Sequence, residues 1–316
     1  MLVVAGAVVL AACTTPPAPG VPGPQIGPRT SWGFPDPFLL ESGGTWHAYA
    51  TNWTGGSIMN VPYMHSDDLV HWSFPADAMP ALGAWAVPGE TWGPSVLKHN
   101  GSYVLYYSAT KASSGKRCVA TATAGGPAGP FVDRGPLVCQ SKRGGTNDPN
   151  VFRAGDGRLF LHWKTEGVIF QEPTRIYAQQ LANNGLAPVE GTRRRVLETA
   201  MPWEGNVIEN PAMSQHDGSY WLFYSANEWN SAHYGVGVAR CSSPLGPCQR
   251  VWSGPLLASS WNLAGPGGAS VTIDGSGRPL LAYHSWEPGK IGYDVGGERR
   301  LFFSYWHTSG GGVYLG

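Results

Sequence analysis

Three acidic residues stand in similar short motifs at widely separated points of the chain. Asp36 lies in the motif PDP, Asp148 in NDPN and Glu209 in IENP. Each motif alone is typical of a turn in which the side chain accepts hydrogen bonds from nearby backbone amides. If the fold brings the three acids together, their mutual repulsion is costly. Such clusters serve as metal ligands or as acid–base groups with different pKa values.

The elements that would position these acids form a repeat. In five segments a glycine is followed by an apolar and aromatic run, and these glycines are Gly44, Gly101, Gly157, Gly218 and Gly277. The spacings between successive glycines are 57, 56, 61 and 59 residues. A second, shorter run precedes each glycine, so each pair of runs predicts a β-hairpin with a tight Gly, Asp or Asn turn.

A regular period filled with strands and turns favours one fold class. About 58 residues suit a blade of about four strands, and the 44 glycines and 27 prolines supply many turns. We therefore predict an all-β, five-bladed β-propeller over residues 31–316. A β-sandwich would also show alternating strands, but it would not give five matching units.

The repeat places the acids in register. Asp36 lies 8 residues before its repeat glycine, and Asp148 and Glu209 each lie 9 residues before theirs. The corresponding positions in the second and fifth units hold Gly93 and Gly268. Because the first strand of a propeller blade lies innermost, we assign the three acids to one equivalent position and expect them to converge at one end of the central channel.

The N-terminal residues indicate export. Leu2 to Ala12 is an apolar run that ends in Cys13, which is too short to span a bilayer as a mature helix. We expect residues 1–13 to be a lipoprotein-type signal peptide with Cys13 lipidated, and an ordinary cleaved signal peptide is the alternative. Residues 14–30 predict an extended Pro-rich tether. The expected location is extracytoplasmic, in a bacterial cell envelope, either lipid-anchored or secreted.

The remaining cysteines agree with an exported protein. Four are left, and the simplest of their three connectivities pairs Cys118 with Cys139 and Cys241 with Cys248. A metal site is disfavoured, because neither pair has the CxxC spacing. Lys plus Arg and Asp plus Glu number 21 each, with no basic run, which argues against a nucleic-acid partner. We expect a monomer.

An ordered set of motifs carries a family resemblance. FPDPFLL, TWGPSVLKHNGSYVLYYSA, NDPNVF and IENPAM followed by GSYWLFYSAN occur in this order, together with SDDLVHW and AGPGGASV. From about Trp32 to the C-terminus the chain resembles glycoside hydrolase family 43. That family comprises five-bladed propeller enzymes that act on arabinose- and xylose-containing glycans.

The resemblance implies a role for each acid. Asp36 would be the general base that activates water, and Glu209 the general acid that protonates the leaving oxygen. Asp148 would raise the pKa of that acid and help to orient the sugar. In the inverting form of glycoside hydrolysis the two carboxyl groups stand roughly 6.5–9.5 Å apart, which leaves room for the water between them.

Further residues are candidates for substrate binding. Trp92 precedes the glycine of the second unit and could stack on a sugar ring, although packing in the core is equally compatible with its position. Arg299 could hold a sugar hydroxyl or a carboxylate. Four more candidates follow the second strands of their units, namely Trp163, Asn227, Trp229 and His284.

One departure from the family pattern concerns metal binding. Many members have a histidine after GPG in the fifth blade that helps to hold a structural ion, whereas this chain has Gly268 there. We expect no cofactor and no metal that is essential to the chemistry.

The first functional hypothesis is an inverting glycosidase acting on arabinan or arabinofuranosyl side chains, with an oligo- or polysaccharide substrate. A β-xylosidase on xylan oligosaccharides is the close alternative. A non-catalytic sugar-binding propeller and a purely structural propeller are disfavoured by the presence of all three acids. A related fructan-cleaving propeller family also has an NDPN motif, but in its first blade, whereas here the motif lies in the third.

Overall fold

The computed structural model describes residues 26–53, 57–140, 144–167 and 172–316. Its secondary structure consists of strands and one short 3₁₀ helix, Pro202–Glu204. In this part of the chain no helix has the length and apolar character needed to cross a bilayer. The predicted signal peptide, Cys13 and most of the tether lie outside the described residues.

The strands form five four-stranded sheets, each built from consecutive antiparallel strands. The first sheet contains β1 (Phe38–Ser42), β2 (Thr45–Tyr49), β3 (Pro62–Ser66) and β4 (Ala76–Asp77), and the second contains β5 (Ala86–His99), β6 (Ser102–Lys111), β7 (Arg117–Ala124) and β8 (Val132–Cys139). The third contains β9 (Thr146–Arg153), β10 (Leu159–Thr165), β11 (Arg175–Leu181) and β12 (Arg194–Glu198). The fourth contains β13 (Ile208–His216), β14 (Ser219–Ala226), β15 (Gly235–Cys241) and β16 (Cys248–Arg250), and the fifth β17 (Ala264–Ile273), β18 (Pro279–Trp286), β19 (Arg300–Ser309) and β20 (Gly312–Leu315).

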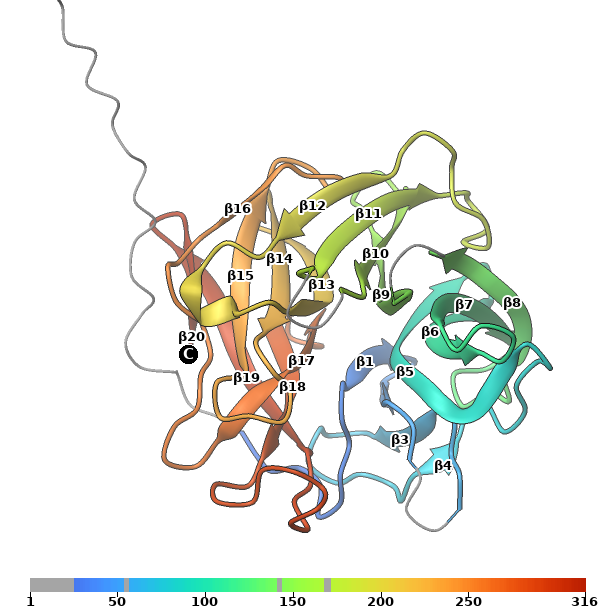
Figure 1. The fold of residues 1–316 in the computed structure, drawn as a ribbon, viewed down its shortest axis with the longest axis horizontal. Coiled ribbons are helices and arrows are strands. Elements are labelled where there is room, and N and C mark those ends of the chain that lie inside the picture. The colour runs from blue at the N-terminus through green and yellow to red at the C-terminus, as the bar shows by residue number, and fades with distance from the viewer. Residues whose placement is uncertain (1–25, 54–56, 141–143, 168–171) are drawn as a thin grey trace, which may run out of the picture.

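The sheets are arranged around a common axis as the five blades of a propeller (Figure 1). The first strand of each blade lies near the axis, and the fourth strands lie toward the outside (Figure 1). Each predicted hairpin is the pair formed by the first and second strands of one blade. The predicted five-bladed β-propeller is therefore confirmed.

The hydrophobic core is divided among the spaces between neighbouring blades. Five buried clusters occur, and each combines residues from two adjacent blades. Between the fourth and fifth blades, for example, Phe223 packs at a ring-centroid distance of 5.1 Å from Trp306. Burial of such faces is what holds adjacent sheets together, since a single sheet cannot cover its own apolar surface.

The ring of blades is closed by the N-terminal part of the described chain. Ile26 exchanges two backbone hydrogen bonds with Phe303 of β19, at 2.8 and 2.9 Å. Phe34 is fully buried in the cluster between the fifth and first blades, where Leu39 of β1 and Leu280 of β18 also lie. The two ends of the propeller are thus joined by backbone pairing and by a shared core.

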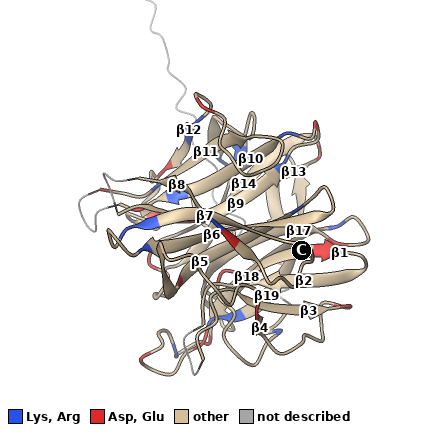
Figure 2. Ribbon diagram, turned by 90° about the vertical axis from the view of Figure 1, so that its right-hand side faces the viewer, with Lys and Arg blue, Asp and Glu red and all other residues tan. Residues whose placement is uncertain are grey.

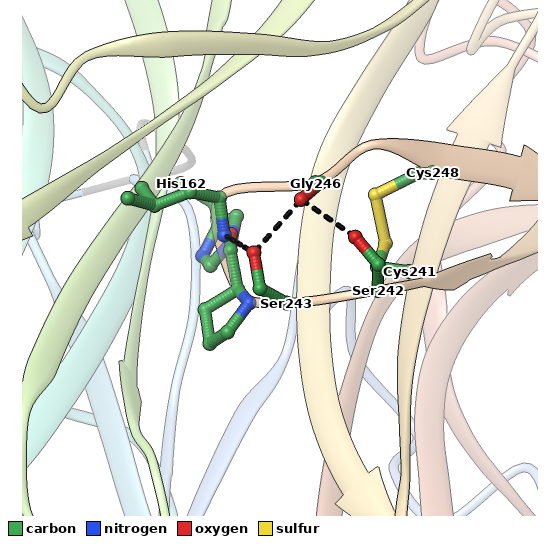
Figure 3. Close-up of a disulfide and its surroundings, with 8 residues drawn as sticks. His162, Cys241, Ser242, Ser243, Gly246 and Cys248 are labelled. Atoms are coloured by element: carbon green, nitrogen blue, oxygen red, sulfur yellow. Dashed lines mark hydrogen bonds between the residues drawn. A yellow bond between two sulfur atoms is a disulfide. The ribbon is translucent and has the colours of Figure 1, made fainter.

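Both predicted disulfides are present. Cys118–Cys139 joins β7 to β8, and Cys241–Cys248 joins β15 to β16. Figure 3 shows the second bond beside the turn that connects its strands, where the buried His162 of the third blade contacts the carbonyl of Pro244 at 2.8 Å. This disulfide therefore closes a turn that packs against the neighbouring blade.

The charged residues are sparse and of both signs. Figure 2 shows the Lys and Arg segments and the Asp and Glu segments scattered over strand ends and loops, with no face of one sign in this view. This distribution is consistent with the zero net charge and with the argument against a nucleic-acid partner.

Candidate active site

A pocket with a volume of about 1180 Å³ lies where the first strands begin. It is lined by seven of the residues expected at the site, which are Asp36, Trp92, Asp148, Asn227, Glu209, Trp229 and Arg299. Two of the expected residues, Trp163 and His284, do not line it. The convergence predicted from the repeat is therefore observed for all three acids.

A β-bulge repeats in the inner strands and explains the motifs. In the third blade Asn147 pairs with Lys164 and Asn150 with His162, so Asp148 and Pro149 together lie opposite Trp163 alone. The same two-against-one arrangement recurs in the second, fourth and fifth blades. Such bulges commonly redirect side chains beside active sites.

The first bulge residue has a left-handed backbone in every blade. These residues are Asp36 (φ 52°), Gly93 (φ 53°), Asp148 (φ 54°), Asn210 (φ 46°) and Gly268 (φ 59°). They surround a small cavity of about 20 Å³ on the propeller axis. Because Gly, Asn and Asp tolerate this backbone best, steric limits determine which residue types occur at the position.

The assignment of Glu209 to this equivalent position is wrong. The fourth blade places Asn210 there, with φ 46°, and Glu209 is the residue before it. Glutamate lacks the short polar side chain that lets Asn and Asp adopt the left-handed region, so Asn210 occupies the bulge position. The spacing of the acids alone does not reveal this constraint. Glu209 still reaches the pocket, and Asn210 connects the other two acids. Its backbone N–H donates to Asp148 Oδ2 at 3.1 Å, and its Nδ2 lies 3.4 Å from Asp36 Oδ1.

Two side chains approach the carboxyl group of Asp36. Thr51 Oγ1 donates to Asp36 Oδ2 at 2.5 Å, and Arg299 Nη1 lies 3.7 Å from the same oxygen. The backbone N–H of Asp36 donates to Nδ1 of His284 at 3.0 Å. The acid is therefore held in one orientation at the mouth of the pocket, with 12% of its side chain exposed to solvent.

His284 supports Asp36 from below instead of lining the pocket, which corrects the expectation of direct substrate contact. It is completely buried, and burial followed by the positive charge of Arg299 lowers its pKa well below the usual value. The neutral ring can then accept the Asp36 N–H at Nδ1. Its Nε2 has no hydrogen-bond partner among the described residues.

Gly268 is required by close packing on the axis. A Cβ atom there would lie 2.4 Å from Asp36 Oδ1 and 2.5 Å from His284 Cε1. The chain therefore has no room for the histidine that many family members carry at this position. Within the described ranges, no three His, Cys, Asp or Glu residues are grouped so that they could hold a metal ion.

Asp148 is the most deeply buried of the three acids, with 6% exposure. Burial raises its pKa to about 8; the negative charges of Glu209, Asp36 and Glu166 add to the effect, and Lys164 opposes it. Asp148 therefore holds a proton at neutral pH. This property suits an acid that influences its neighbours through hydrogen bonding.

Both carboxylate oxygens of Glu209 have donors. Tyr234 Oη donates to Oε1 at 2.7 Å, and Lys164 Nζ donates to Oε2 at 2.5 Å. Lys164 Nζ also lies 3.3 Å from Glu166 Oε2, and Arg117 forms an ion pair with Glu166 Oε1. A chain of alternating charges thus reaches Glu209 from the second and third blades.

Lys164, Glu166 and Arg117 also line the pocket, although they are not among the residues expected from the sequence. A signal was present, since Lys164 is the seventh residue after the repeat Gly157 in an otherwise apolar run. The equivalent residues in the other blades are Thr51, Ser108, Ser225 and His284. A charged residue in the predicted second strand of a propeller blade demands a partner, because an unpaired buried charge is costly.

Aromatic side chains also line the pocket. The Arg299 guanidinium lies 4.7 Å from the Trp229 ring centroid and 5.6 Å from that of Tyr293, and its Nε donates to Tyr293 Oη at 3.0 Å. Trp229 stacks on Trp286 and is 37% exposed. On the other side, Trp92 is half-buried in the pocket lining, with Arg117 4.3 Å from its ring centroid. The exposed rings offer apolar surfaces on which a sugar can stack.

Trp163 belongs to the core. It is 0% exposed, packs in the cluster between the second and third blades, and stacks on Tyr177. The expectation that it lines the pocket is therefore wrong. It is the single residue opposite the bulge at Asp148 and Pro149, where its side chain points into the space between blades.

Comparison with known proteins identifies relatives of the same architecture. The profile of the family described as "Glycosyl hydrolases family 43" matches residues 29–310. A probable arabinan endo-1,5-alpha-L-arabinosidase A of Aspergillus fumigatus is 25% identical over 88% of this chain and 89% of that protein. The extracellular endo-alpha-(1->5)-L-arabinanase 1 of Bacillus subtilis is 23% identical over 80% of each. A crystal structure of a thermostable family-43 glycoside hydrolase superposes with a TM-score of 0.80, 25% identity and 95% coverage of both chains.

Proposed function

The chain belongs to glycosyl hydrolases family 43, and from this we propose that it hydrolyses arabinan or arabinofuranosyl side chains by an inverting mechanism. Membership and relatives establish that it is a glycosidase. The main support for placing this activity in the pocket is that three acids from different blades line it beside exposed aromatic rings. The arabinan-cleaving relatives support arabinose over xylose as the substrate sugar.

The proposed mechanism gives each acid one role. Asp36, oriented by Thr51 and Arg299, accepts a proton from the attacking water. Glu209 donates a proton to the leaving oxygen as the glycosidic bond breaks. Asp148, which keeps its own proton, orients the sugar and influences Glu209 through its contact with Asn210. Attack and departure on opposite faces of the sugar invert the anomeric configuration.

A substrate panel tests this proposal. Purified protein is incubated with linear α-1,5-arabinan, xylan, and the 4-nitrophenyl glycosides of α-L-arabinofuranose and β-D-xylopyranose. We expect release of arabinose or arabino-oligosaccharides, and the product lengths then distinguish internal from terminal cleavage. A proton-NMR time course should show the β-anomer first, because an α linkage is inverted. Faster cleavage of the xyloside would establish the alternative activity, and binding without turnover would establish a non-catalytic propeller.

We further propose that the protein is exported and lipid-anchored at Cys13. The support is the apolar run before Cys13, the two disulfides, and the extracellular relative from Bacillus subtilis. Radiolabelled palmitate should be incorporated by the expressed full chain and lost in Cys13→Ala. Labelling that persists in this variant would contradict the anchor, and a protein recovered unlabelled from the medium would support the ordinary signal peptide.

A further inference from the structure

In three of the five blades the residue seven positions after the repeat glycine accepts a backbone N–H of the next blade, whereas Ser108 in the second blade has no hydrogen-bond partner among the described residues. Ser225 Oγ accepts the N–H of Gly268 at 2.9 Å, and Thr51 Oγ1 accepts the N–H of Gly93 at 3.0 Å. His284 accepts the N–H of Asp36 in the same way. In each case the side chain anchors the backbone of the neighbouring bulge, which is a structural role.

Lys164 breaks this pattern. It occupies the same position in β10, but it is a donor and cannot accept a backbone N–H. Instead its ammonium extends to the side chain of Glu209 in the next blade, at 2.5 Å from Oε2. Its side chain is only 6% exposed, so the charge is paired inside the protein and not dissolved in water. Lys164 therefore places a buried positive charge against Glu209, the proposed proton donor, at a position where Thr51, Ser225 and His284 accept a backbone N–H.

Two carboxylates, Glu166 and Glu209, pair with the ammonium of Lys164. Burial alone would lower the pKa of the ammonium, but the charges of Glu166, Glu209 and Asp148 raise it, so the group stays protonated. Glu166 is in turn held by Arg117, which covers one face of Trp92. Lys164 therefore has two carboxylate partners, one on each side.

We propose that Lys164 is a positioning residue that makes Glu209 a stronger acid by stabilising the carboxylate left after proton delivery, with Glu166 as the second partner of its ammonium. This inference rests on the proposed function and deepens it. In the step concerned, the Glu209 proton passes to the glycosidic oxygen and the bond from the anomeric carbon to that oxygen breaks. The bonding pair stays on the leaving oxygen. The oxygen of the attacking water forms the new bond to the anomeric carbon and gives one proton to Asp36. Lys164 keeps its own proton throughout.

The charged and titratable groups around Glu209 come from three blades. Lys164 and Glu166 face it from the third blade together with Asp148, Tyr234 from the loop before β15, and Asp36 from the first blade. Among these, Lys164 supplies the positive charge in direct contact. Asp148 acts in the opposite sense when it is ionised. Glu209 thus lies between one cation in direct contact and several carboxyl groups.

We expect the basic limb of the kcat/KM profile to shift in opposite directions in two matched variants. Lys164→Met removes the charge and keeps the length, so Glu209 becomes harder to deprotonate and the basic limb of the kcat/KM profile moves up by about 1 pH unit. Glu166→Gln keeps the Lys164–Glu209 pair and removes the competing carboxylate, so the same limb moves down. A defect in folding or packing would not shift the two variants in opposite directions. Thermal melting of both variants checks that they are folded.

Leaving-group dependence supplies a second readout. On the acidic plateau, Lys164→Met should lose about 10- to 100-fold in kcat/KM on an arabino-oligosaccharide, whose leaving group needs the proton. It should lose less than about 3-fold on the 2,4-dinitrophenyl arabinofuranoside, whose leaving group departs without one. Equal losses on both substrates together with an unmoved limb would overturn the proposal and leave Lys164 a structural residue.

A direct titration separates this proposal from the proposed function. Carbon-13 NMR of carboxyl-labelled glutamate, with the Glu209→Gln spectrum used for assignment, follows Glu209 without any substrate. We expect its titration midpoint to rise in Lys164→Met and to fall in Glu166→Gln. An unchanged midpoint in a wild-type protein that cleaves arabinan would refute only the role of Lys164. A shifted midpoint in a protein inactive on every glycan would refute only the proposed function.

Discussion

The carboxyl group of Asp36 is held by contacts from three blades. Thr51 donates from its own blade, Asn210 approaches from the fourth, and His284 in the fifth fixes the backbone. We expect Asp36→Asn to lower kcat on arabinan by about 10²- to 10⁴-fold, because an amide cannot accept the proton of water. The measurement is steady-state kinetics beside calorimetric binding of an arabino-oligosaccharide. Near-native turnover with an intact fold would remove Asp36 from the mechanism.

Asp148 shows what a buried acid costs. The folded chain keeps its proton up to about pH 8, whereas the ordinary value is 3.8, so folding takes up a proton between these values. The free energy of unfolding therefore falls as the pH rises from about 4 to about 8. Below about pH 4 the burial of Asp148 causes no such loss of stability. Asp148→Asn removes the titration and retains an oxygen that accepts the N–H of Asn210.

We expect Asp148→Asn to be more stable than the native chain by about 1–3 kcal/mol at pH 7 and less active. Urea unfolding at pH 4, 6 and 8 measures the effect, and the two proteins should approach each other in stability at pH 4. Lower stability of the variant at pH 7 would show that the carboxyl group is stabilised in the fold and not strained by it.

At the level of elements, the bulge is the device that turns a strand into part of a site. Without it, successive side chains of an inner strand would alternate between the two faces of the blade. With it, the first bulge residues surround the cavity on the axis, and Glu209, which precedes one of them, lines the pocket. Asp148 and Glu209 therefore reach one site from non-equivalent positions, although their motifs look alike.

A pair of glycine variants tests the packing around the bulge. Gly268 and Gly277 both have a left-handed backbone, with φ 59° and 84°, but only at Gly268 would a Cβ meet Asp36 and His284. Gly277→Ala should cost about 1 kcal/mol from its backbone alone. Gly268→Ala should cost about 3 kcal/mol and lower kcat, because Asp36 must move. Equal losses of stability, measured by urea unfolding, would mean that the axis is less tightly packed than the structure indicates.

At the level of the whole molecule, a propeller of this kind must close its ring. The closure here combines the pairing of Ile26 with Phe303 and the core around Phe34. No covalent bond joins the first and fifth blades in the described residues, since each disulfide lies within one blade. The packing at this junction must therefore supply the stability that continuous chain supplies elsewhere.

Phe34→Ala should weaken the junction by about 3–5 kcal/mol, because it leaves a cavity in a fully buried cluster. Phe74→Ala is the matched control, since Phe74 is 70% exposed and its loss should cost less than about 1 kcal/mol. Thermal and urea unfolding measure both. If the two variants lose similar stability, the closure does not depend on this cluster.

The sequence by itself determined the number of blades, the hairpin of each blade and the presence of three acids at one end of the channel, and it favoured the two local disulfides over the other connectivities. These features depend on contacts between residues close in the chain, such as Cys118 with Cys139, and on repetition of one local pattern. Periodic hydrophobicity and turn residues record such contacts directly.

Only the tertiary structure decided which residues meet across blades. It moved Glu209 out of the position of Asp148, buried Trp163, set His284 beneath Asp36, and brought Lys164 to Glu209, 45 residues away. The physical reason is that a bulge shifts register by one residue, which exchanges the faces on which side chains lie, and spacing alone does not show where it occurs. The neighbours of each acid then follow from blade-to-blade packing.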